Sequence, residues 1–194
     1  MAKLAAYPEP MDVEQFLAFN DTRPDKEKWE LLDGELFLNA TPVNSHQIVV
    51  DNLVRHLHPL LRAAGNRYRA STGTGVRLSD ITLVEPDVMV RPRHVRDGNV
   101  FEDIVVAFEV LSQSTRRNDL KFKRTAYAAL ASLTHYVAIA PRNFDVRVFA
   151  RSADWAEVRL SQPEQSVAFD SLGISLPLAA IYDDMADFMT GPQE

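Results

Sequence analysis

Two carboxylates next to apolar strand-like segments are the residues of this sequence best suited to chemistry. Glu109 lies within the apolar run 104–111, and Asp87 follows Pro86 at the start of another β-like segment. An ionised carboxylate in an apolar strand must be paired, bound to a metal or protonated, because its burial otherwise costs several kcal/mol. A simpler interpretation stays open, in which Glu109 forms an ordinary salt bridge at a frayed strand end and Asp87 belongs to a turn.

The other reactive side chains limit which metal such carboxylates could bind. Cysteine is absent and only five histidines are present. This composition favours a hard cation such as Mg²⁺ or Mn²⁺ over zinc or copper, and such a cation binds phosphate oxygens. Lys123 follows the Glu109 segment in a helical pattern, so the loop between them can fold its ammonium back toward Glu109. Tyr127 lies four residues later on the same helical face. Simple solvent exposure is the alternative for Lys123.

Local sequence patterns predict the elements that position these residues. An Asp-x-x-Gln capping box starts a short helix, and the Asp33-Gly34 pair suits the positive φ angles of a tight hairpin turn. Asn44 or Ser45 can cap a second, longer helix, and Gly65 can end it. The predicted helices span 12–20, 45–64 and 119–130, with a short one after Pro177. The predicted strands lie at 28–39 (a hairpin), 67–72 and 75–79 (a pair), 86–91, 104–111, 135–140, 146–150, 157–161 and 166–170.

The order of these elements predicts an α/β fold in one domain. The segment 104–111 is apolar at consecutive positions, as in strands buried on both faces, so we expect it near the centre of the sheet. Ligands of α/β proteins collect at the ends of central strands, which directs attention to Glu109 and Asp87. With 194 residues and 46% hydrophobic content, the chain can bury one sizeable core, and no linker divides residues 1–194.

The net charge and the lengths of the apolar segments limit which partners and which compartment we expect for the protein. The net charge of −6 counts against a surface that attracts nucleic acid everywhere, so any such contact must be local. Two basic clusters could supply it or could be solvated faces: Arg91, Arg93, His94 and Arg96, and Arg116, Arg117, Lys121, Lys123 and Arg124. No apolar run is long enough to span a membrane and no export signal is visible, so we expect a cytoplasmic protein without a membrane partner.

The stretch 29–141 resembles the Uma-two family, a bacterial group of restriction-endonuclease-like proteins within the PD-(D/E)XK nuclease superfamily. The matching elements are ELLDGEL at 30–36, His46 at the start of the long helix, PDV at 86–88 and EVLSQSTRRNDLKFKRTAYAAL at 109–130. The resemblance implies a restriction-endonuclease-like mixed central β-sheet flanked by helices, with an N-terminal helix and hairpin and a C-terminal β extension. The nuclease core would cover about residues 29–141.

The resemblance also implies roles for individual residues. Asp87 and Glu109 would bind the metal, and Lys123 would be the cation near the attacking water. Our mechanistic hypothesis adds the backbone carbonyl of Val110 as a metal ligand, with Lys123 orienting the water or stabilising developing charge. The resemblance further implies Glu30 and His46 as supporting residues of the catalytic site. We add Asp119 and Tyr127 as further supporting residues and, from the second basic cluster, Arg116, Arg117, Lys121 and Arg124 as nucleic-acid contacts. Two positions depart from the family pattern: Leu111 stands where many superfamily members have the lysine, and Gln113 replaces a loop proline.

These observations predict a Mg²⁺-dependent or Mn²⁺-dependent endonuclease that hydrolyses phosphodiester bonds in nucleic acid, DNA above all, as a homodimer. His46, at a helix N-terminus, could contact a phosphate or orient Glu30, although a lone histidine there is more often structural. Two rival functions stay open. The same fold could act as a binding module for nucleic acid or protein without turnover, which the acidic charge favours, or it could hydrolyse small phosphate esters, which needs no basic groove.

Overall fold

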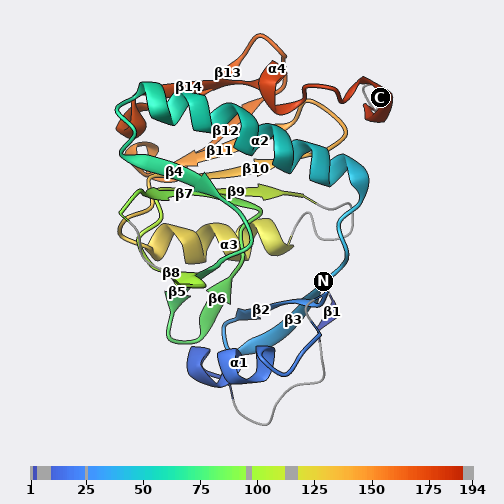
Figure 1. Ribbon diagram of the computed structural model, residues 1–194, viewed down its shortest axis with the longest axis vertical. Helices are drawn as coiled ribbons and strands as arrows, with labels where there is room; N and C mark the ends of the chain where they lie inside the picture. The colour runs from blue at the N-terminus through green and yellow to red at the C-terminus, as the bar shows by residue number, and fades with distance from the viewer. Residues whose placement is uncertain (1, 4–9, 25, 95–97, 112–117, 190–194) are drawn as a thin grey trace.

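The computed structural model describes residues 2–3, 10–24, 26–94, 98–111 and 118–189, and for residues 2, 3 and 118–121 only the backbone. Its helices are α1 (Val13–Asn20), α2 (Asn44–Ala63), α3 (Asn118–Ala129) and α4 (Leu178–Ile181). Its strands are β1 (Ala2–Lys3), β2 (Lys28–Leu32), β3 (Glu35–Asn39), β4 (Tyr68–Ser71), β5 (Gly75–Ser79), β6 (Thr82–Val84), β7 (Val88–Pro92), β8 (Val100–Phe101), β9 (Val106–Val110), β10 (His135–Ile139), β11 (Val146–Ala150), β12 (Glu157–Leu160), β13 (Ser166–Phe169) and β14 (Ile174–Pro177). Figure 1 shows their arrangement.

A mixed sheet with the strand order β12-β11-β10-β9-β7-β4 forms the centre of the molecule. Only β9 and β10 run parallel, and the other neighbours are antiparallel. Every residue of β9 is buried, so the prediction of a central, doubly covered strand is confirmed. Helix α2 covers one face of this sheet and α3 the other (Figure 1).

Alternation along β9 divides the core between the two helices. Phe108 packs with Leu53 and Leu57 of α2, whereas Ala107 packs with Tyr127 of α3. Neighbouring side chains of a strand point to opposite faces, so Glu109, two residues after Ala107, points toward α3. The strand therefore places a carboxylate on the face that α3 covers.

A second sheet, β1-β3-β2-β6-β5-β8, lies beyond α3 and carries α1 on its outer side (Figure 1). The predicted hairpin is confirmed: β2 and β3 pair through a turn in which Asp33 and Gly34 have φ angles of 51° and 77°. Gly34 is also required by space, because a Cβ there would lie 2.5 Å from Cβ of Pro10. The predicted capping box of α1, formed by Asp12 and Gln15, is present.

Two local predictions were wrong. The strands predicted as a pair at 67–72 and 75–79 lie in different sheets, because β4 pairs with β7 while β5 pairs with β6 and β8. The N-cap of α2 is Val43, without a side-chain hydrogen bond, because Asn44 and Ser45 already lie inside the helix. Gly65 does follow the end of α2 with a φ of 94°, as predicted.

The C-terminal strands β13 and β14 form a two-stranded sheet, and α4 contacts α2. The buried Asn52 of α2 fixes this segment by donating to the carbonyl oxygens of Ile181 at 3.1 Å and Asp183 at 2.7 Å. The expected C-terminal β extension is confirmed, and the segment that contains it packs against α2. Within the described residues, the helices are all too short or too polar to cross a membrane.

Candidate active site

The antiparallel pairing of β7 and β9 brings Asp87 beside Glu109. Val88, the first residue of β7, faces Phe108 of β9, so Asp87 just before β7 falls opposite Glu109. The backbone N–H of Val110 donates to Oδ2 of Asp87 at 2.8 Å, which fixes the carboxylate at the end of the central strand. The two predicted acids therefore meet where β9 ends and β7 begins.

Glu109 is bound by two side chains of α3. The Lys123 ammonium donates to Oε1 at 3.1 Å and to Oε2 at 3.2 Å, and the Tyr127 hydroxyl donates to Oε1 at 3.0 Å. Glu109 is 9% exposed and Lys123 is 6% exposed. Glu109 therefore does not lie at a frayed strand end, and Lys123 is not exposed to solvent. Because Lys123 and Tyr127 are one helical turn apart, α3 presents both donors to the same carboxylate.

Lys123 joins the central sheet to the second sheet through Glu30 of β2. Its Nζ lies 3.0 Å from Oε1 of Glu30, and the same oxygen accepts the backbone N–H of Glu85 at 3.0 Å. Glu30 is fully buried, and its Oε2 has no hydrogen-bond partner among the described residues. Three elements that are distant in sequence, β2, β9 and α3, thus contribute to one buried polar cluster.

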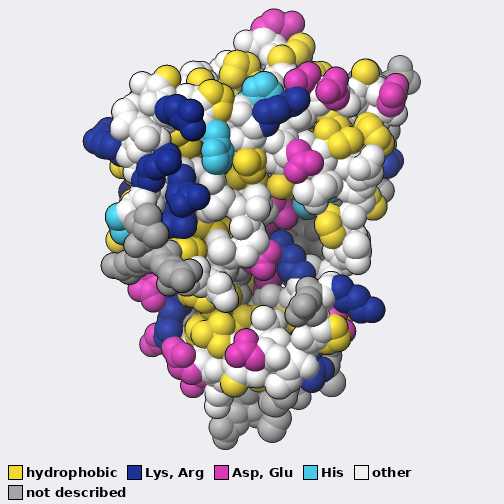
Figure 2. Space-filling model, viewed as in Figure 1, with side chains coloured by type: hydrophobic (Ala, Val, Ile, Leu, Met, Phe, Trp, Pro, Cys, Tyr) yellow, Lys and Arg dark blue, Asp and Glu magenta, His cyan; other side chains and the backbone are white. Residues whose placement is uncertain are grey.

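Asp87 has two further neighbours at the mouth of this cluster. Nε2 of His46, in the first turn of α2, lies 3.2 Å from Oδ1 of Asp87. Nζ of Lys28 lies 3.6 Å from the same oxygen and 3.5 Å from Oε1 of Glu85. Lys28 was missed by sequence reasoning, although its position two residues before Glu30 puts both side chains on one face of β2. Figure 2 shows acidic and basic side chains meeting in a hollow between the α2 half of the molecule and the β2–β3 half.

The carboxyl group of Glu109 is harder to ionise than an ordinary glutamate. Burial raises its pKa to about 7; the Lys123 ammonium partly offsets this rise, and the charges of Asp87 and Glu30 add to it. Burial would lower the pKa of Lys123, but Glu109 and Glu30 outweigh that effect and raise it well above the usual value. Lys123 therefore stays an ammonium at neutral pH.

The other two carboxyl groups ionise more readily than usual. Burial tends to raise the pKa of both, but Lys123 and a backbone N–H lower that of Glu30. The hydrogen bond with His46 and the charge of Lys28 lower the pKa of Asp87. Three acids thus share two ammonium groups, and the excess of carboxylates opposes the ionisation of Glu109.

This excess of carboxyl groups over ammonium groups suits a divalent cation. The oxygens of Asp87 and Glu109 are hard donors, and the unpartnered Oε2 of Glu30 lies in the same cluster. Among the described residues, no three His, Asp or Glu side chains converge as a ready metal site. Mg²⁺ commonly needs only one or two carboxylates and keeps several waters, so two acids and a backbone carbonyl fit it.

The remaining predicted contacts lie outside this cluster or outside the described residues. Arg124 is half-buried, with its guanidinium 5.4 Å from the centre of the Phe149 ring. Arg116 and Arg117 lie outside the described residues, and Asp119 and Lys121 lie on α3 with side chains that are not described. In the first basic cluster, Arg91 stacks over Phe101, Arg93 bonds Asn66 and His94 pairs with Asp103, while Arg96 lies outside the described residues.

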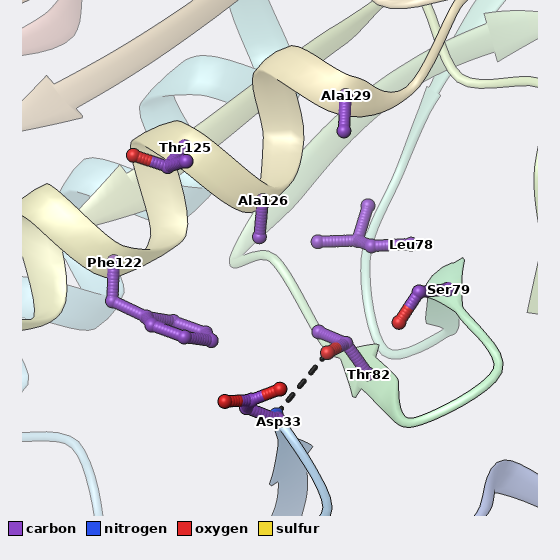
Figure 3. Close-up of a pocket in the computed structure, with 8 residues that line it drawn as sticks. All are labelled: Asp33, Leu78, Ser79, Thr82, Phe122, Thr125, Ala126 and Ala129. Atoms are coloured by element: carbon purple, nitrogen blue, oxygen red, sulfur yellow. Dashed lines mark hydrogen bonds between the residues drawn. The ribbon is translucent and has the colours of Figure 1, made fainter.

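A separate hollow of about 580 Å³ is lined by other residues of α3 than Lys123 and Tyr127 (Figure 3). Its walls come from α3, from β5 and β6 and from the turn of the β2–β3 hairpin. They consist of Asp33, Leu78, Ser79, Thr82, Phe122, Thr125, Ala126 and Ala129. None of these residues was predicted for the site.

Comparison with known proteins gives a family and a fold. The family model Uma2, described as "Putative restriction endonuclease", matches residues 13–179. A crystal structure described as a "putative nuclease belonging to DUF820" from Anabaena variabilis ATCC 29413 superposes with a TM-score of 0.71 at 15% identity, over 89% of this chain and 98% of that one. At this identity the likeness concerns the fold, and it confirms the expected mixed sheets flanked by helices. No curated protein matches the chain.

Proposed function

The chain belongs to the Uma2 family of restriction-endonuclease-like proteins, and on that premise we propose that it is a Mg²⁺-dependent endonuclease acting on DNA. The observation that carries this proposal is the convergence of Asp87, Glu109 and Lys123 in one buried cluster, with the Lys123 amine 3.1 Å from Glu109. Two acids and an amine at the end of a central strand are the groups that phosphodiester hydrolysis requires. The proposal includes a cytoplasmic homodimer, since cutting both strands of a duplex suits paired sites.

In this proposal Asp87, Glu109 and the carbonyl of Val110 would hold the cation, Mg²⁺ or Mn²⁺. When bound, a divalent cation polarises a phosphodiester and lowers the pKa of a water molecule. The ammonium of Lys123 orients Glu109 through two hydrogen bonds and places positive charge where the phosphate becomes more negative. Glu30 anchors Lys123.

Three further groups keep the acids in place. Tyr127 donates to Oε1 of Glu109 and so fixes the rotation of that carboxylate. His46 lies against Oδ1 of Asp87, and the N–H of Val110 binds Oδ2. Both oxygens of Asp87 are therefore oriented before any ligand arrives, which reduces the ordering that binding must supply.

A cleavage assay tests the proposal. Purified wild-type protein is incubated with Mg²⁺ or Mn²⁺ and with single-stranded DNA, duplex DNA, RNA and a small phosphate ester. Asp87→Asn and Glu109→Gln keep the side-chain shapes and should lower DNA cleavage by about 100-fold or more. Glu164→Gln, at an exposed position between β12 and β13, makes the same chemical change away from the site and should cleave as the wild type does.

The outcomes separate the rival functions. Cleavage of DNA that is lost with Asp87 supports the endonuclease. Residual cutting that is equal in the wild type and Asp87→Asn would indicate contamination and contradict the proposal. Binding of nucleic acid without turnover would indicate a binding module, and turnover of only the small ester would indicate a phosphohydrolase.

A further inference from the structure

Two lysines serve the acidic cluster, and the structure holds them differently. Lys123 lies within hydrogen-bonding distance of three carboxylate oxygens and has a side chain that is 7% exposed. Lys28 lies 3.5 and 3.6 Å from its nearest carboxylate oxygens and has a side chain that is 32% exposed. These separations exceed the length of a charge-assisted hydrogen bond, about 2.7–2.9 Å. The carboxylates of Glu85 and Asp87 therefore attract Lys28 without holding its ammonium in a short hydrogen bond.

The position of Lys28 makes it the ammonium at the mouth of the cluster. It lies on the same face of β2 as Glu30, two residues nearer to the start of the strand. Its Nζ faces Oδ1 of Asp87, the acid that also contacts His46. Burial would lower the pKa of Lys28, but Asp87, Glu85 and the other acids of the cluster outweigh burial and raise it. The side chain therefore carries its positive charge at neutral pH.

A cation bound to Oδ1 of Asp87 would compete with the ammonium of Lys28 for that oxygen. Like charges at such short distances repel each other, so both cannot rest against Oδ1 at full strength. A phosphodiester that reaches the cluster brings negative charge next to three carboxylates and needs compensation there. Lys28 can supply it by rotating its flexible four-carbon side chain, without any movement of β2.

We propose, resting on the proposed function, that Lys28 is an exchangeable counter-ion. Its ammonium neutralises Asp87 in the metal-free protein, and it contacts the phosphate of the nucleic acid once a divalent cation replaces it at Asp87. Lys123, by contrast, keeps Glu30 and Glu109 as partners throughout. This role predicts that loss of Lys28 changes the affinities for metal and for nucleic acid in opposite directions.

Two binding measurements test this prediction with Lys28→Gln. Calorimetric titration with Mn²⁺ and no nucleic acid should show about three- to tenfold tighter binding, because the competing ammonium is gone. Fluorescence anisotropy with a labelled DNA duplex and its separate strands, in Ca²⁺, should show about three- to tenfold weaker binding at low salt. The slope of log Kd against log salt should fall by about one unit, as expected for one lost phosphate contact.

Matched variants control for charge and folding. Lys26→Gln removes the same charge from an exposed position two residues earlier and should leave the Mn²⁺ affinity unchanged. Lys28→Arg keeps the charge and should bind both probes as the wild type does, within about twofold. Urea unfolding of each variant shows whether the fold is intact before the affinities are compared.

The results distinguish this inference from the proposed function. Affinities for Mn²⁺ and DNA that both weaken, or that both stay unchanged, in Lys28→Gln would overturn the exchange. A wild type that cleaves DNA while Lys28→Gln behaves as Lys26→Gln does would overturn this inference and leave the endonuclease standing. A wild type that neither binds nor cleaves nucleic acid would overturn both.

Discussion

The two faces of α3 border regions of opposite character. Lys123 and Tyr127 on one face bind the carboxylates of Glu109 and Glu30 in a buried polar cluster. Phe122 and Ala126 on the other face line a hollow whose exposed surface is mainly apolar (Figure 3). Hydrolysis of a phosphodiester needs groups that bind a cation and stabilise negative charge, and the first region has them. The presence of a hollow alone therefore does not locate the chemistry.

The difference also concerns what each region contributes to stability. In the polar cluster, removal of one charged group leaves its partners buried without a counter-charge, which strongly lowers the free energy of unfolding. Around the hollow, Phe122 is 37% exposed, so a substitution there changes little of the buried surface. Substitutions on neighbouring positions of one helix should therefore have very different effects.

The largest effect is expected from Lys123→Met compared with Phe122→Ala. Met keeps most of the side-chain volume but leaves Glu30 and Glu109 without their ammonium, so the free energy of unfolding should fall by about 3–5 kcal/mol at neutral pH. Phe122→Ala should lower it by about 1 kcal/mol or less. Urea unfolding of both variants measures the difference. Equal losses of unfolding free energy in the two variants would contradict the greater sensitivity of the polar cluster.

An intermediate effect is expected from pH. The pKa of Glu109 is raised from 4.5 to about 7 in the folded protein, so between these values the folded state binds more protons than the unfolded state. Stability from this group is therefore complete below about pH 4.5 and is lost as pH rises through 7. Relative to Glu109→Gln, the wild type should lose on the order of 1–3 kcal/mol between pH 5 and 8. A constant difference across this range would show that Glu109 is ionised throughout.

The lowered pKa values of Asp87 and Glu30 do not interfere with that measurement. Carboxyl groups of this kind stabilise the fold above their ordinary pKa values and lose that effect only as pH falls through the lowered values. Their contribution is therefore already complete at pH 5, and the change between pH 5 and 8 reports on Glu109.

The smallest effect is expected when the hollow is filled. Ala126→Leu adds apolar volume on the face of α3 that lines the hollow, away from Lys123. Unfolding free energy should change by no more than about 0.5 kcal/mol, and DNA cleavage should stay within about twofold of the wild type. Parallel urea unfolding and cleavage measurements check both expectations. A large loss of cleavage would mean that the hollow takes part in the reaction.

Local patterns in the sequence were sufficient for much of the fold. The hairpin turn at Asp33 and Gly34 depends on φ angles that these two residues adopt easily, and the buried β9 depends on consecutive apolar residues. Glu109 could be selected as a site residue for a related reason, since a carboxylate inside such a strand needs a partner. These features are encoded within a few neighbouring residues.

Contacts between distant segments could not be predicted in this way. Glu30 and Lys123 are 93 residues apart in the chain, and their contact exists only because the second sheet packs against α3. The same packing buries Lys123, whereas most lysines are exposed. Lys28 was missed because the sequence does not show that β2 lies beside Asp87; only its position two residues before Glu30 on the same strand could have indicated it. The separation of β4 and β5 into two sheets likewise depends on long-range pairing.

Binding of Mn²⁺, followed by electron paramagnetic resonance of the free ion, tests most directly whether the carboxylate cluster holds a divalent cation. Wild-type protein and Glu164→Gln should bind Mn²⁺ with the same affinity, and Asp87→Asn should bind it about 10–100-fold more weakly. Equal affinity of all three proteins would contradict a cation site at Asp87 and Glu109.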